Sequence, residues 1–431
     1  MKISPARIAA FDILQRIETE KAFSSVLLPL YEDGLIAADR SLCHELTLGV
    51  LRSQILLDAV IDQLTDKRKI DASVRLAIRL GLYQLRFLGR VPDYSAINES
   101  VNLTQRAKKT SAKAFVNAIL RKATREWPEL SFRDEIERIS VESSHPRWLI
   151  ERWALEFGRS EADEIARANN QIPQVAFRVN GDSSGETLDL IAESRPSTKV
   201  KGCFIVNHRN PRLGALAEAG RIYVQDEGSQ LVANAVSIPQ NGLFLDVCAA
   251  PGGKTGLIAN RFSKLGLTTV AGDLHWQRVE FLRDNCSRQN VKGVGFVQYN
   301  AEKCLPFREQ TFDRVLADVP CSGTGTIRHN PELRYFLNPE DFADLAAKQL
   351  SILKQASNLV KVGGMIIYST CSFEREENED VCRSFLADRS DFMGVKPDVA
   401  ERFFTNDGYA RTWPHRDEMD GFFIAAFERR H

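Results

Sequence analysis

The chain lacks several features that mark special classes of protein. It contains no stretch of about 18 or more apolar residues, so we expect no membrane-spanning helix. None of its eight cysteines belongs to a Cys-x-x-Cys pair, which argues against zinc sites and redox dithiols. Its amino terminus has no apolar signal core. The sequence therefore predicts a cytoplasmic protein with reduced thiols, no metal site and no membrane partner.

Repeats and low-complexity tracts are also absent, and the composition is ordinary. Hydrophobic residues make up 43% of the 431 residues and charged residues 26%, which provides enough apolar material for real cores. This composition excludes a disordered chain and a small disulfide scaffold. The length corresponds to two or three domains.

The chain has no net charge, because 57 basic residues balance 57 acidic ones, but the charge is unevenly distributed. Between residues 67 and 125, fourteen basic residues stand against Asp71, Asp93 and Glu99, a local excess of eleven positive charges. Such a field attracts phosphates and predicts binding to a nucleic acid that weakens with salt. The run is equally compatible with solvated helix faces, and both interpretations stay open here. The basic residues are Lys67, Arg68, Lys69, Arg75, Arg79, Arg86, Arg90, Arg106, Lys108, Lys109, Lys113, Arg121, Lys122 and Arg125.

Three regions of the chain differ in their hydrophobic pattern. Over residues 1–140 apolar residues recur three and four apart, as in Ile13, Leu14 and Ile17, which predicts an all-α module. Residues 141–236 combine two further helices with short strand-like runs and predict a small α/β linking module. Residues 237–431 repeat a strand, a turn and a helix, which is typical of a Rossmann-like α/β domain.

The strands of the third region indicate where functional residues should lie. We expect strands at residues 243–247, 268–273, 312–318 and 364–370, with one helix reaching about residue 289 and another over about 341–360. Alternating strands and helices of this kind form a parallel, doubly wound sheet. Ligands of such sheets bind beyond the carboxyl ends of the strands, so we expect the functional side chains there.

A glycine-rich turn follows the first of these strands. Small residues let a ligand approach the backbone closely, and the N–H groups at the start of the following helix are free to bind it. Asp273 ends the next strand, twenty residues after Gly253, at a place where an acidic residue accepts hydrogen bonds from ribose hydroxyls. The turn reads Leu245-Asp246-Val247-Cys248-Ala249-Ala250-Pro251-Gly252-Gly253-Lys254-Thr255.

Three ligands compete for this turn. Gly253-Lys254-Thr255 matches the end of a P-loop, but the first glycine of that motif would stand at position 248, which is Cys248. The Gly-x-Gly-x-x-Gly pattern of dinucleotide sites is absent. S-adenosylmethionine, which has a ribose and an adenine but no phosphate, is the ligand left. Asp273 favours a ligand over a merely structural turn.

Two cysteines follow two further strands, in Asp318-Val319-Pro320-Cys321-Ser322-Gly323 and in Ser369-Thr370-Cys371-Ser372. A single buried cysteine is usually an apolar filler. Two cysteines at the functional edge of one sheet indicate chemistry instead. We interpret the other six as structural, with Cys248 lining the cofactor turn.

A methyl donor and two thiols together indicate methylation of carbon 5 of a pyrimidine. Carbon 5 is a poor nucleophile until a thiolate adds to carbon 6, and a second group must then remove the proton of carbon 5 so that elimination frees the enzyme. The attacking thiol must be activated, and the target base must leave its stack. Asp318 is the candidate acid partner, either for ring nitrogen 3 or for the exocyclic amine that marks cytosine.

These motifs resemble the RNA cytosine-5 methyltransferases of the Nol1/Nop2/Sun family. The resemblance covers essentially the whole chain, and the paired cysteine motifs at 318–322 and 370–372 are its specific part. Residues 96–101 and 115–122 resemble the NusB-like helical module of a bacterial subgroup of the family. The other matching segments are residues 145–149, 224–230, 246–255 and 420–423.

The resemblance implies roles for individual residues. Cys371 is the nucleophile and Cys321 assists release of the product, the reverse of the DNA cytosine-5 enzymes, which use the cysteine after proline. Two positions depart from the family pattern, because Asn300 stands where aspartate is usual and Val319 where alanine is usual. The residues expected to bind S-adenosylmethionine or to lie against it are Cys248, Ala249, Ala250, Pro251, Gly252, Gly253, Lys254, Asp273, Arg278, Asn300 and Asp318.

The resemblance also implies a substrate, which is a cytosine of small-subunit 16S ribosomal RNA, cytosine 967. Residues 1–140 would then be a NusB-like RNA-binding domain, residues 141–236 an RNA-binding or linking domain and residues 237–431 the methyltransferase domain of a monomer. A cytosine in another ribosomal RNA or in a transfer RNA is an alternative substrate. A non-catalytic RNA-binding factor is an alternative of another class, and a P-loop NTPase is the least favoured one.

Overall fold

The computed structural model describes residues 3–181, 185–206 and 210–431. Met1 and Lys2, which belong to the amino terminus discussed above, lie outside the described residues. The chain divides into two compact units, Met1–Gln171 with Ile327–Leu337 and Ile172–Thr326 with Asn338–His431. The domain boundaries expected near residues 140 and 236 stay a prediction. Within the described ranges, no helix combines the length and the apolar character needed to cross a bilayer.

The first unit is built from helices, as its periodicity predicts. The long helix α3 packs beside α1, α4 and α7, and Leu46, Val50 and Leu57 on its inner face are fully buried. The pattern of apolar residues three and four apart thus becomes the core of a helical bundle. Its helices are α1 (Pro5–Glu20), α2 (Ser24–Glu32), α3 (Ala37–Leu64), α4 (Ala72–Phe87), α5 (Asp93–Arg106), η1 (Thr110–Ala112), α6 (Lys113–Arg125), α7 (Glu135–Ser143), α8 (Arg147–Phe157) and α9 (Arg159–Asn169).

A short segment from much later in the sequence completes this unit. Residues Ile327–Leu337, which include helix α15 (Leu333–Phe336), follow the Cys321 motif but pack with the helices. The guanidinium of Arg334 is fully buried there and donates to the carbonyl oxygens of Ser143 and Ser144 and to Asn170 Oδ1, at 3.1, 3.2 and 2.9 Å. The sequence analysis assigned this segment to the α/β domain.

The second unit begins with a small antiparallel sheet. Its strand order is β2-β3-β1-β4, with β1 pairing to both β3 and β4. Leu190 and Leu213 of the two accompanying helices are buried against it. The α/β nature of this module is as predicted. Its elements are β1 (Val175–Val179), α10 (Glu186–Ala192), β2 (Arg195–Pro196), β3 (Cys203–Val206), α11 (Arg212–Glu218), β4 (Ile222–Val224) and the connecting helix α12 (Glu227–Asn234).

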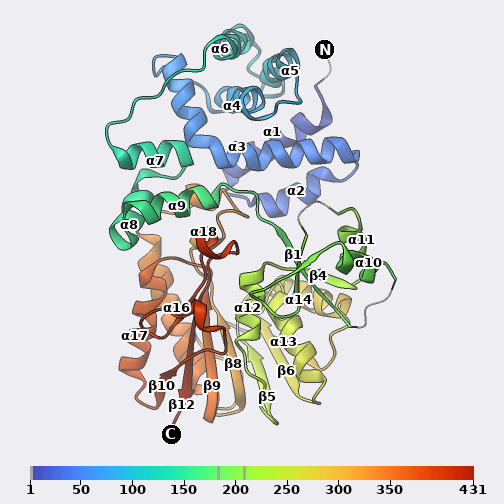
Figure 1. Cartoon of the computed structure of the whole chain (residues 1–431), viewed down its shortest axis with the longest axis vertical. Helices are drawn as coiled ribbons and strands as arrows, with labels where there is room; N and C mark the ends of the chain where they lie inside the picture. Colours follow the sequence, from blue (N-terminus) through green and yellow to red (C-terminus); the bar gives the residue numbers. More distant parts are fainter. Residues whose placement is uncertain (1–2, 182–184, 207–209) are drawn as a thin grey trace. The chain divides into compact units, whose positions relative to one another are not determined.

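The large sheet of the second unit has the order β10-β12-β9-β8-β5-β6-β7, with β11 paired to β12 (Figure 1). The five strands from β9 to β7 are parallel, which confirms the Rossmann-like prediction. Strand β12 runs antiparallel to both of its neighbours, β9 and β10, which makes the sheet mixed. Its strands are β5 (Leu243–Asp246), β6 (Thr268–Asp273), β7 (Val294–Gln298), β8 (Phe312–Asp318), β9 (Val360–Thr370), β10 (Phe392–Val395), β11 (Ala410–Arg411) and β12 (Phe423–Arg429).

Helices bury both faces of this sheet. On one face Leu245 and Ile366 pack with Leu353 of α16, and on the other Phe244 packs with Phe262 of α13. Adjacent residues of one strand therefore enter opposite cores, as expected for a doubly wound sheet. The helices are α13 (Gly253–Ser263), α14 (Trp276–Arg288), η2 (Thr324–Thr326), α16 (Asp341–Asn358), η3 (Arg375–Glu377), α17 (Glu379–Asp388), η4 (Glu401–Phe403) and α18 (Pro414–Asp417).

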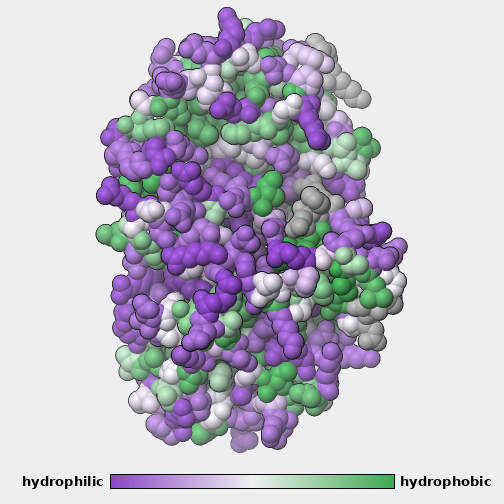
Figure 2. Space-filling view, viewed as in Figure 1, coloured by the Kyte–Doolittle hydropathy of each residue, from purple (hydrophilic) through white to green (hydrophobic). Residues whose placement is uncertain are grey.

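The surface is mainly polar. Figure 2 shows hydrophilic residues over most of the visible face, with hydrophobic residues in scattered patches. The parallel strands share one direction, so β5, β6, β8 and β9 end at the same edge of the sheet. The segments that follow these four strand ends carry the predicted chemistry.

Candidate active site

The turn after β5 is fixed by one buried carboxylate and one glycine. Asp246, the last residue of β5, is fully buried and accepts a hydrogen bond from Thr255 Oγ1 at 2.7 Å, which ties the strand end to the first turn of α13. Gly252 has a φ of 101°, a conformation that side-chain-bearing residues rarely adopt. A Cβ at this position would also lie 2.8 Å from Leu282 Cδ1. The turn therefore brings small residues and free backbone N–H groups to the sheet edge.

A pocket of about 210 Å³ lies at this turn. Of the predicted cofactor residues, Cys248, Ala249, Ala250, Pro251, Gly253, Lys254 and Asp318 line it. The remaining lining residues, Tyr223, Val224, Gln225, Asp226, Ser229 and Asp246, come from β4, from the segment that joins β4 to α12, from α12 and from β5. The pocket is thus formed where the small sheet, the turn and the end of β8 meet within the second unit.

The lining fits a ligand that brings hydrogen-bond donors. Asp246 Oδ1 is buried in the pocket region without a donor among the described residues, an arrangement that costs free energy unless a ligand supplies one. S-adenosylmethionine has an ammonium group and ribose hydroxyls that can do so. Burial raises the pKa of Asp246 to about 7, against a Thr255 hydrogen bond that lowers it. Burial likewise raises the pKa of Cys248, so this thiol stays protonated.

Four predicted cofactor residues, Gly252, Asp273, Arg278 and Asn300, lie outside this pocket lining. The carboxylate of Asp273 accepts from the N–H groups of Ala250 at 3.2 Å and Leu274 at 2.8 Å, and it pairs with Arg278 at 3.1 Å. Its oxygens hold the turn and keep lone pairs for a ribose. Asn300 Oδ1 accepts the N–H of Glu302 at 3.0 Å and so stabilises the turn after β7.

The two predicted cysteines meet at the adjacent ends of β8 and β9. Asp318 pairs with Ser369 in the parallel register, so the segments that follow run side by side. The sulfur atoms of Cys321 and Cys371 lie 3.3 Å apart as free, half-buried thiols, and the N–H of Cys371 points at Cys321 Sγ at 3.3 Å. The hydrogen bond with Cys371, reinforced by burial, raises the pKa of Cys321 well above its ordinary value. Cys321 therefore keeps its proton and can donate it to Cys371.

An ion pair joins the thiol side of the site to the cofactor turn. The Nζ of Lys254, on α13, lies 2.7 Å from Asp318 Oδ2, and the other carboxylate oxygen accepts from Ser369 Oγ at 2.6 Å. Burial disfavours the charged lysine, but the attraction of Asp318 outweighs it and raises the pKa of Lys254. Its ammonium also lies 4.9 Å from the ring centre of Phe422. Asp318 is thus held as a hydrogen-bond acceptor by Lys254 and Ser369.

The carboxy-terminal motif 420–423 closes around the Cys371 segment. The N–H of Gly325 donates to the carbonyl of Cys371 at 2.9 Å, and the N–H of Gly421 donates to the carbonyl of Gly325 at 2.8 Å. A Cβ at Gly325 would lie 2.1 Å from the Gly421 oxygen. Glycine at position 325 therefore lets its own segment form backbone hydrogen bonds with the Cys371 segment on one side and with the 420–423 segment on the other.

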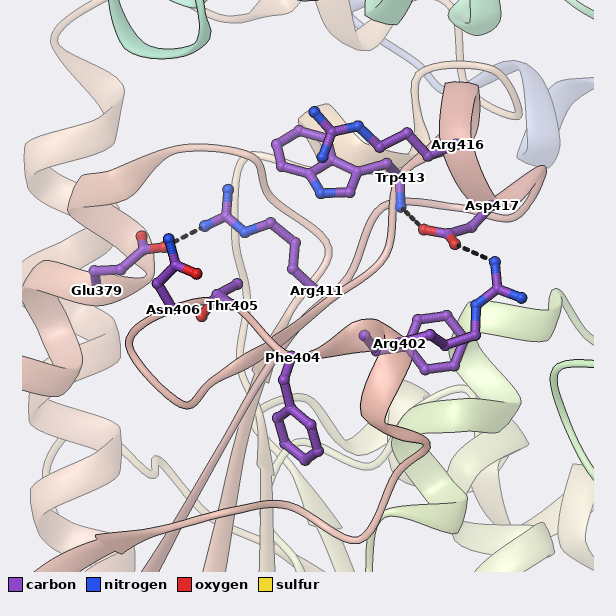
Figure 3. A pocket seen from close by; sticks show the side chains of 10 residues that line it. Glu379, Arg402, Phe404, Thr405, Asn406, Arg411, Trp413, Arg416 and Asp417 are labelled. Carbon is purple, nitrogen blue, oxygen red and sulfur yellow. Dashed lines mark hydrogen bonds and ion pairs between the residues drawn. The ribbon is translucent and has the colours of Figure 1, made fainter.

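A second, larger pocket of about 650 Å³ adjoins the segment after Cys371 (Figure 3). Figure 3 shows Arg411 paired with Glu379 and Asp417 between Trp413 and Arg402. Arg411 also donates to the carbonyl of Phe373 at 3.2 Å, and the Trp413 ring stacks on Phe373 with centroids 5.1 Å apart. These contacts hold the chain two residues beyond Cys371.

Sequence reasoning missed the contribution of the small sheet. Arg178 of β1 is buried and donates to the carbonyl of Gly253 at 2.9 Å, to Gln225 Oε1 at 3.1 Å and to Gln289 Oε1 at 2.7 Å. Burial lowers the pKa of Arg178 to about 10. The motif at 224–230 was visible in the sequence and contains Gln225, but no spacing rule connects it with a turn twenty-five residues later.

The fold and this site together define a Rossmann-like methyltransferase that uses S-adenosylmethionine. Family models match three parts of the chain, namely "NusB family" at residues 4–125, "Methyltr_RsmF/B-like, ferredoxin-like domain" at 145–187 and "16S rRNA methyltransferase RsmB/F" at 234–428. By these matches and by its full-length relatives, the chain belongs to the family of ribosomal RNA small subunit methyltransferase B, whose members are RNA methyltransferases.

Two relatives and one solved structure illustrate the similarity. "Probable ribosomal RNA small subunit methyltransferase B" of Bacillus subtilis strain 168 is 34% identical over 100% of both chains. "Ribosomal RNA small subunit methyltransferase B" of Pseudomonas putida is 34% identical over 88% of each. The crystal structure of PH0851 covers 100% of both chains with a TM-score of 0.83 and 26% identity.

Proposed function

We propose that the chain transfers a methyl group from S-adenosylmethionine to carbon 5 of a cytosine in 16S ribosomal RNA, cytosine 967, through a transient bond between Cys371 and carbon 6 of the base. The observation that carries this proposal is the pair of thiols 3.3 Å apart beside Asp318 of the cofactor pocket. The names of the relatives support the small-subunit RNA as substrate.

The two thiols act in different steps of the proposed reaction. The Cys371 thiol releases its proton to solvent, and the thiolate sulfur forms a bond to carbon 6. The electron pair of the C5–C6 double bond moves into the ring, which makes carbon 5 nucleophilic. When bound, S-adenosylmethionine supplies the methyl group as an electrophile. Release requires that a base take the proton from carbon 5, that the double bond re-form and that the electrons of the C6–S bond return to Cys371. We assign Cys321 to this release because its sulfur lies beside that of Cys371. The interaction with the Cys371 thiol that raises the pKa of Cys321 in the free protein is weakened once Cys371 is bonded to carbon 6, so Cys321 can then lose its proton to solvent and act as the base.

The ion pair of Asp318 and Lys254 selects cytosine. Since the carboxylate is paired with an ammonium and accepts from Ser369, it acts as an acceptor and suits the exocyclic amine of cytosine. The Lys254 ammonium is then the donor that stabilises the negative charge in the ring. In this proposal Asp318 binds the exocyclic amine, and Lys254 rather than Asp318 stabilises the charge that develops in the ring.

The helical unit is proposed to hold the RNA. Four of the fourteen basic residues form ion pairs, three of them with carboxylates outside the counted run: Arg75 and Arg79 with Asp58, and Arg106 with Asp12, while Lys109 pairs with Asp71. These pairs reduce the positive field expected from the sequence. The residues around a pocket of about 320 Å³, among them Arg68 and Lys69, are therefore the stronger candidates.

This pocket combines two cations, Arg68 and Lys69, with an aromatic ring, and its lining also contains the ion pair of Lys109 and Asp71. Arg68 lies over the Phe115 ring at 5.7 Å, and Ile70 and Ala112 line the same space. Cations next to an aromatic ring suit the phosphate and base of single-stranded RNA.

Tritium release tests the proposed reaction directly. A 16S RNA transcript labelled with tritium at carbon 5 of cytosine should lose one tritium to water for each methyl group gained, because carbon 5 exchanges its hydrogen for the methyl group. Methyl transfer without tritium release would contradict the proposal and indicate a nitrogen or oxygen target. Isothermal titration without heat from S-adenosylmethionine would favour the non-catalytic RNA-binding factor.

Bisulfite mapping of ribosomal RNA from cells with and without this gene tests the position. Loss of one modified cytosine at 967 is the expected result. Loss at another ribosomal or transfer RNA cytosine would keep the chemistry and contradict the site. The monomeric state, the absence of a metal site and the cytoplasmic location stay predictions.

A further inference from the structure

Two serines lie directly behind the two thiols. Ser322 follows Cys321 and Ser372 follows Cys371, and both serines are buried. Their hydroxyl oxygens lie 3.0 Å apart, and Thr324 Oγ1 lies 3.4 Å from Ser372 Oγ. The segments that carry the thiols are therefore also joined by the side chains of these serines and Thr324.

One carboxylate holds the two serines together. Glu377, the last residue of η3, is fully buried. Its Oε2 accepts from the hydroxyls of Ser322 and Ser372 at 2.5 Å each, and its Oε1 accepts from the backbone N–H of Ser322 at 2.8 Å. Gln349 of α16 donates to the same Oε1 at 2.8 Å and to the carbonyl of Pro320 at 2.9 Å. Glu377 thus holds Ser322 directly, and Gln349 links it to Pro320 on the other side of Cys321.

The cost of burying the Glu377 carboxylate favours one fixed arrangement of its hydrogen-bond donors. A buried carboxylate without a cation costs several kcal/mol of free energy, and the four donors offset that cost only while all of them point at the two oxygens. Separating the two thiol segments would strip Glu377 of at least one donor. The carboxylate therefore acts as a clamp that resists any increase in the distance between the segments.

A glutamine would not reproduce the hydrogen bonds of this carboxylate. Its oxygen can accept from Ser322 N–H and Gln349 only if its NH₂ group faces the two serine hydroxyls, which must then turn from donors into acceptors. The substitution keeps the size of the side chain but removes the charge and replaces the two charge-assisted hydroxyl bonds with weaker ones. The side chain touches no sulfur atom, so its action on the reaction is indirect.

We propose that Glu377 is a positioning residue that sets the spacing of the Cys321 and Cys371 sulfur atoms. It does so because its one carboxylate accepts hydrogen bonds from both Ser322 and Ser372. The proposal rests on the proposed function for its catalytic consequence, but the spacing itself is a property of the free protein. The negative charge also adds to the hydrogen bond and burial that raise the pKa of Cys321.

Thiol bridging in the full chain measures the spacing without RNA. Dibromobimane joins two thiols only when they lie within a few ångström, and peptide mapping identifies the bridged pair. The expected result is rapid bridging of Cys321 to Cys371 in the native protein and at least about tenfold slower bridging in Glu377→Gln. Asp380→Asn, which removes a half-buried carboxylate three residues further on, is the control and should bridge at the native rate.

Methyl transfer measures the consequence. A displacement of about 1 Å at reacting groups costs about 100-fold in rate, so kcat of Glu377→Gln should fall to that extent while KM for RNA and the Kd for S-adenosylmethionine stay within threefold. Ser322→Ala and Ser372→Ala, which remove one donor each and leave the fold intact, should each lower kcat. Neither should lower it further in the Glu377→Gln background, because all three act through one clamp.

Native bridging and native kcat in a folded Glu377→Gln protein would overturn the proposal, as would additive effects of the serine substitutions. Failure of the proposed function has a different signature. If the native protein releases no tritium from labelled cytosine while bridging still depends on Glu377, the clamp stands and the reaction assignment falls.

Discussion

Asp246 shows how a single buried carboxylate links the site to the stability of the fold. The pKa of this group is about 7 in the folded protein, against an ordinary value of 3.8, because burial disfavours its charge. The folded state therefore retains a proton that the unfolded chain releases between about pH 4 and pH 7. The free energy of unfolding falls as the pH rises through this window. Above about pH 7 the full free-energy cost of burying the ionised carboxylate is present.

Asp246→Asn should remove this pH dependence. Asparagine carries no charge and can still accept from Thr255, so the variant should gain stability relative to the native protein as the pH rises from 5 to 8. The expected gain over this range is about 3 kcal/mol, because about two pKa units of the shift lie within it. Urea denaturation of both proteins at several pH values, without cofactor, measures the difference. Asp284→Asn, at a side chain that is 65% exposed, is the control. If the free energies of unfolding of Asp246→Asn and the native protein differed by the same amount at pH 5 and pH 8, the account would be contradicted.

At this scale the sequence reveals the residues that follow strand ends. Cys321, Cys371 and Asp318 are predictable together because parallel strands end at one edge. Arg178 and Glu377 are not, because their importance depends on contacts with residues far away in the sequence. A polar residue in a short strand or a 3-10 turn carries no signal of the groups that fold against it.

Local patterns predict β5, β6, β8 and β9 of the parallel sheet, whereas the sequence analysis does not predict β7 or the edge beyond β9. The predicted strands 268–273 and 312–318 have the bounds of β6 and β8, because apolar runs between turn residues define buried parallel strands. The partner of a strand is a long-range property. That β12 lies beside β9, with Phe423 opposite Thr370, depends on the whole sheet and cannot be read from the run 423–427.

The end of α3 and the start of α4 carry the prediction for RNA binding. Lys67, Arg68 and Lys69 lie between these helices, and two of them line the pocket beside Phe115. Substituting all three by glutamine should weaken RNA binding and flatten its dependence on salt by about 0.7 per lost phosphate contact, that is by up to about 2. Filter binding over a range of salt concentrations measures the slope.

A triple variant with the same change in charge is the control. Arg16, Arg133 and Arg167 are each bound in an i,i+4 ion pair, so replacing them by glutamine should leave the slope nearly unchanged. Equal flattening in both variants would mean that only net charge matters. An unchanged slope in the first variant would return the run 67–69 to an ordinary solvated surface.

At the scale of the whole molecule, the helical unit is built from two segments that are far apart in the sequence. After the Cys321 motif it enters the helical unit at Ile327 and leaves it at Leu337, so the segment that carries one active-site thiol is covalently continuous with part of the helical unit. Tyr335 donates to the carbonyl of Leu51 at 2.7 Å, and the N–H of Ser24 donates to Glu332 at 2.7 Å. No composition or period marks these residues as part of a different unit.

Arg334→Met should destabilise the helical unit selectively. The substitution removes a buried donor from the carbonyls of Ser143 and Ser144 and from Asn170 Oδ1. The two carbonyls keep Asn170 Nδ2 and the Tyr335 hydroxyl as donors, so the main loss is at Asn170 Oδ1 and costs about 1–3 kcal/mol. Hydrogen exchange should accelerate in residues 135–169 and 327–337 and remain unchanged in β5 to β9. Arg133→Met, at a side chain that is 74% exposed, serves as the control. Acceleration confined to the parallel sheet would contradict the assignment of this segment.

The central claim, that one sulfur bonds transiently to the base and its neighbour frees the product, is tested most directly by trapping the covalent complex on a denaturing gel. With target RNA and S-adenosylmethionine, Cys321→Ser should accumulate a protein–RNA complex, because release fails after attack. Cys371→Ser should form no complex and transfer no methyl group, and Cys304→Ser, at an exposed thiol elsewhere, should behave as the native protein. Normal turnover by Cys321→Ser, or trapped RNA on Cys371→Ser, would contradict the account.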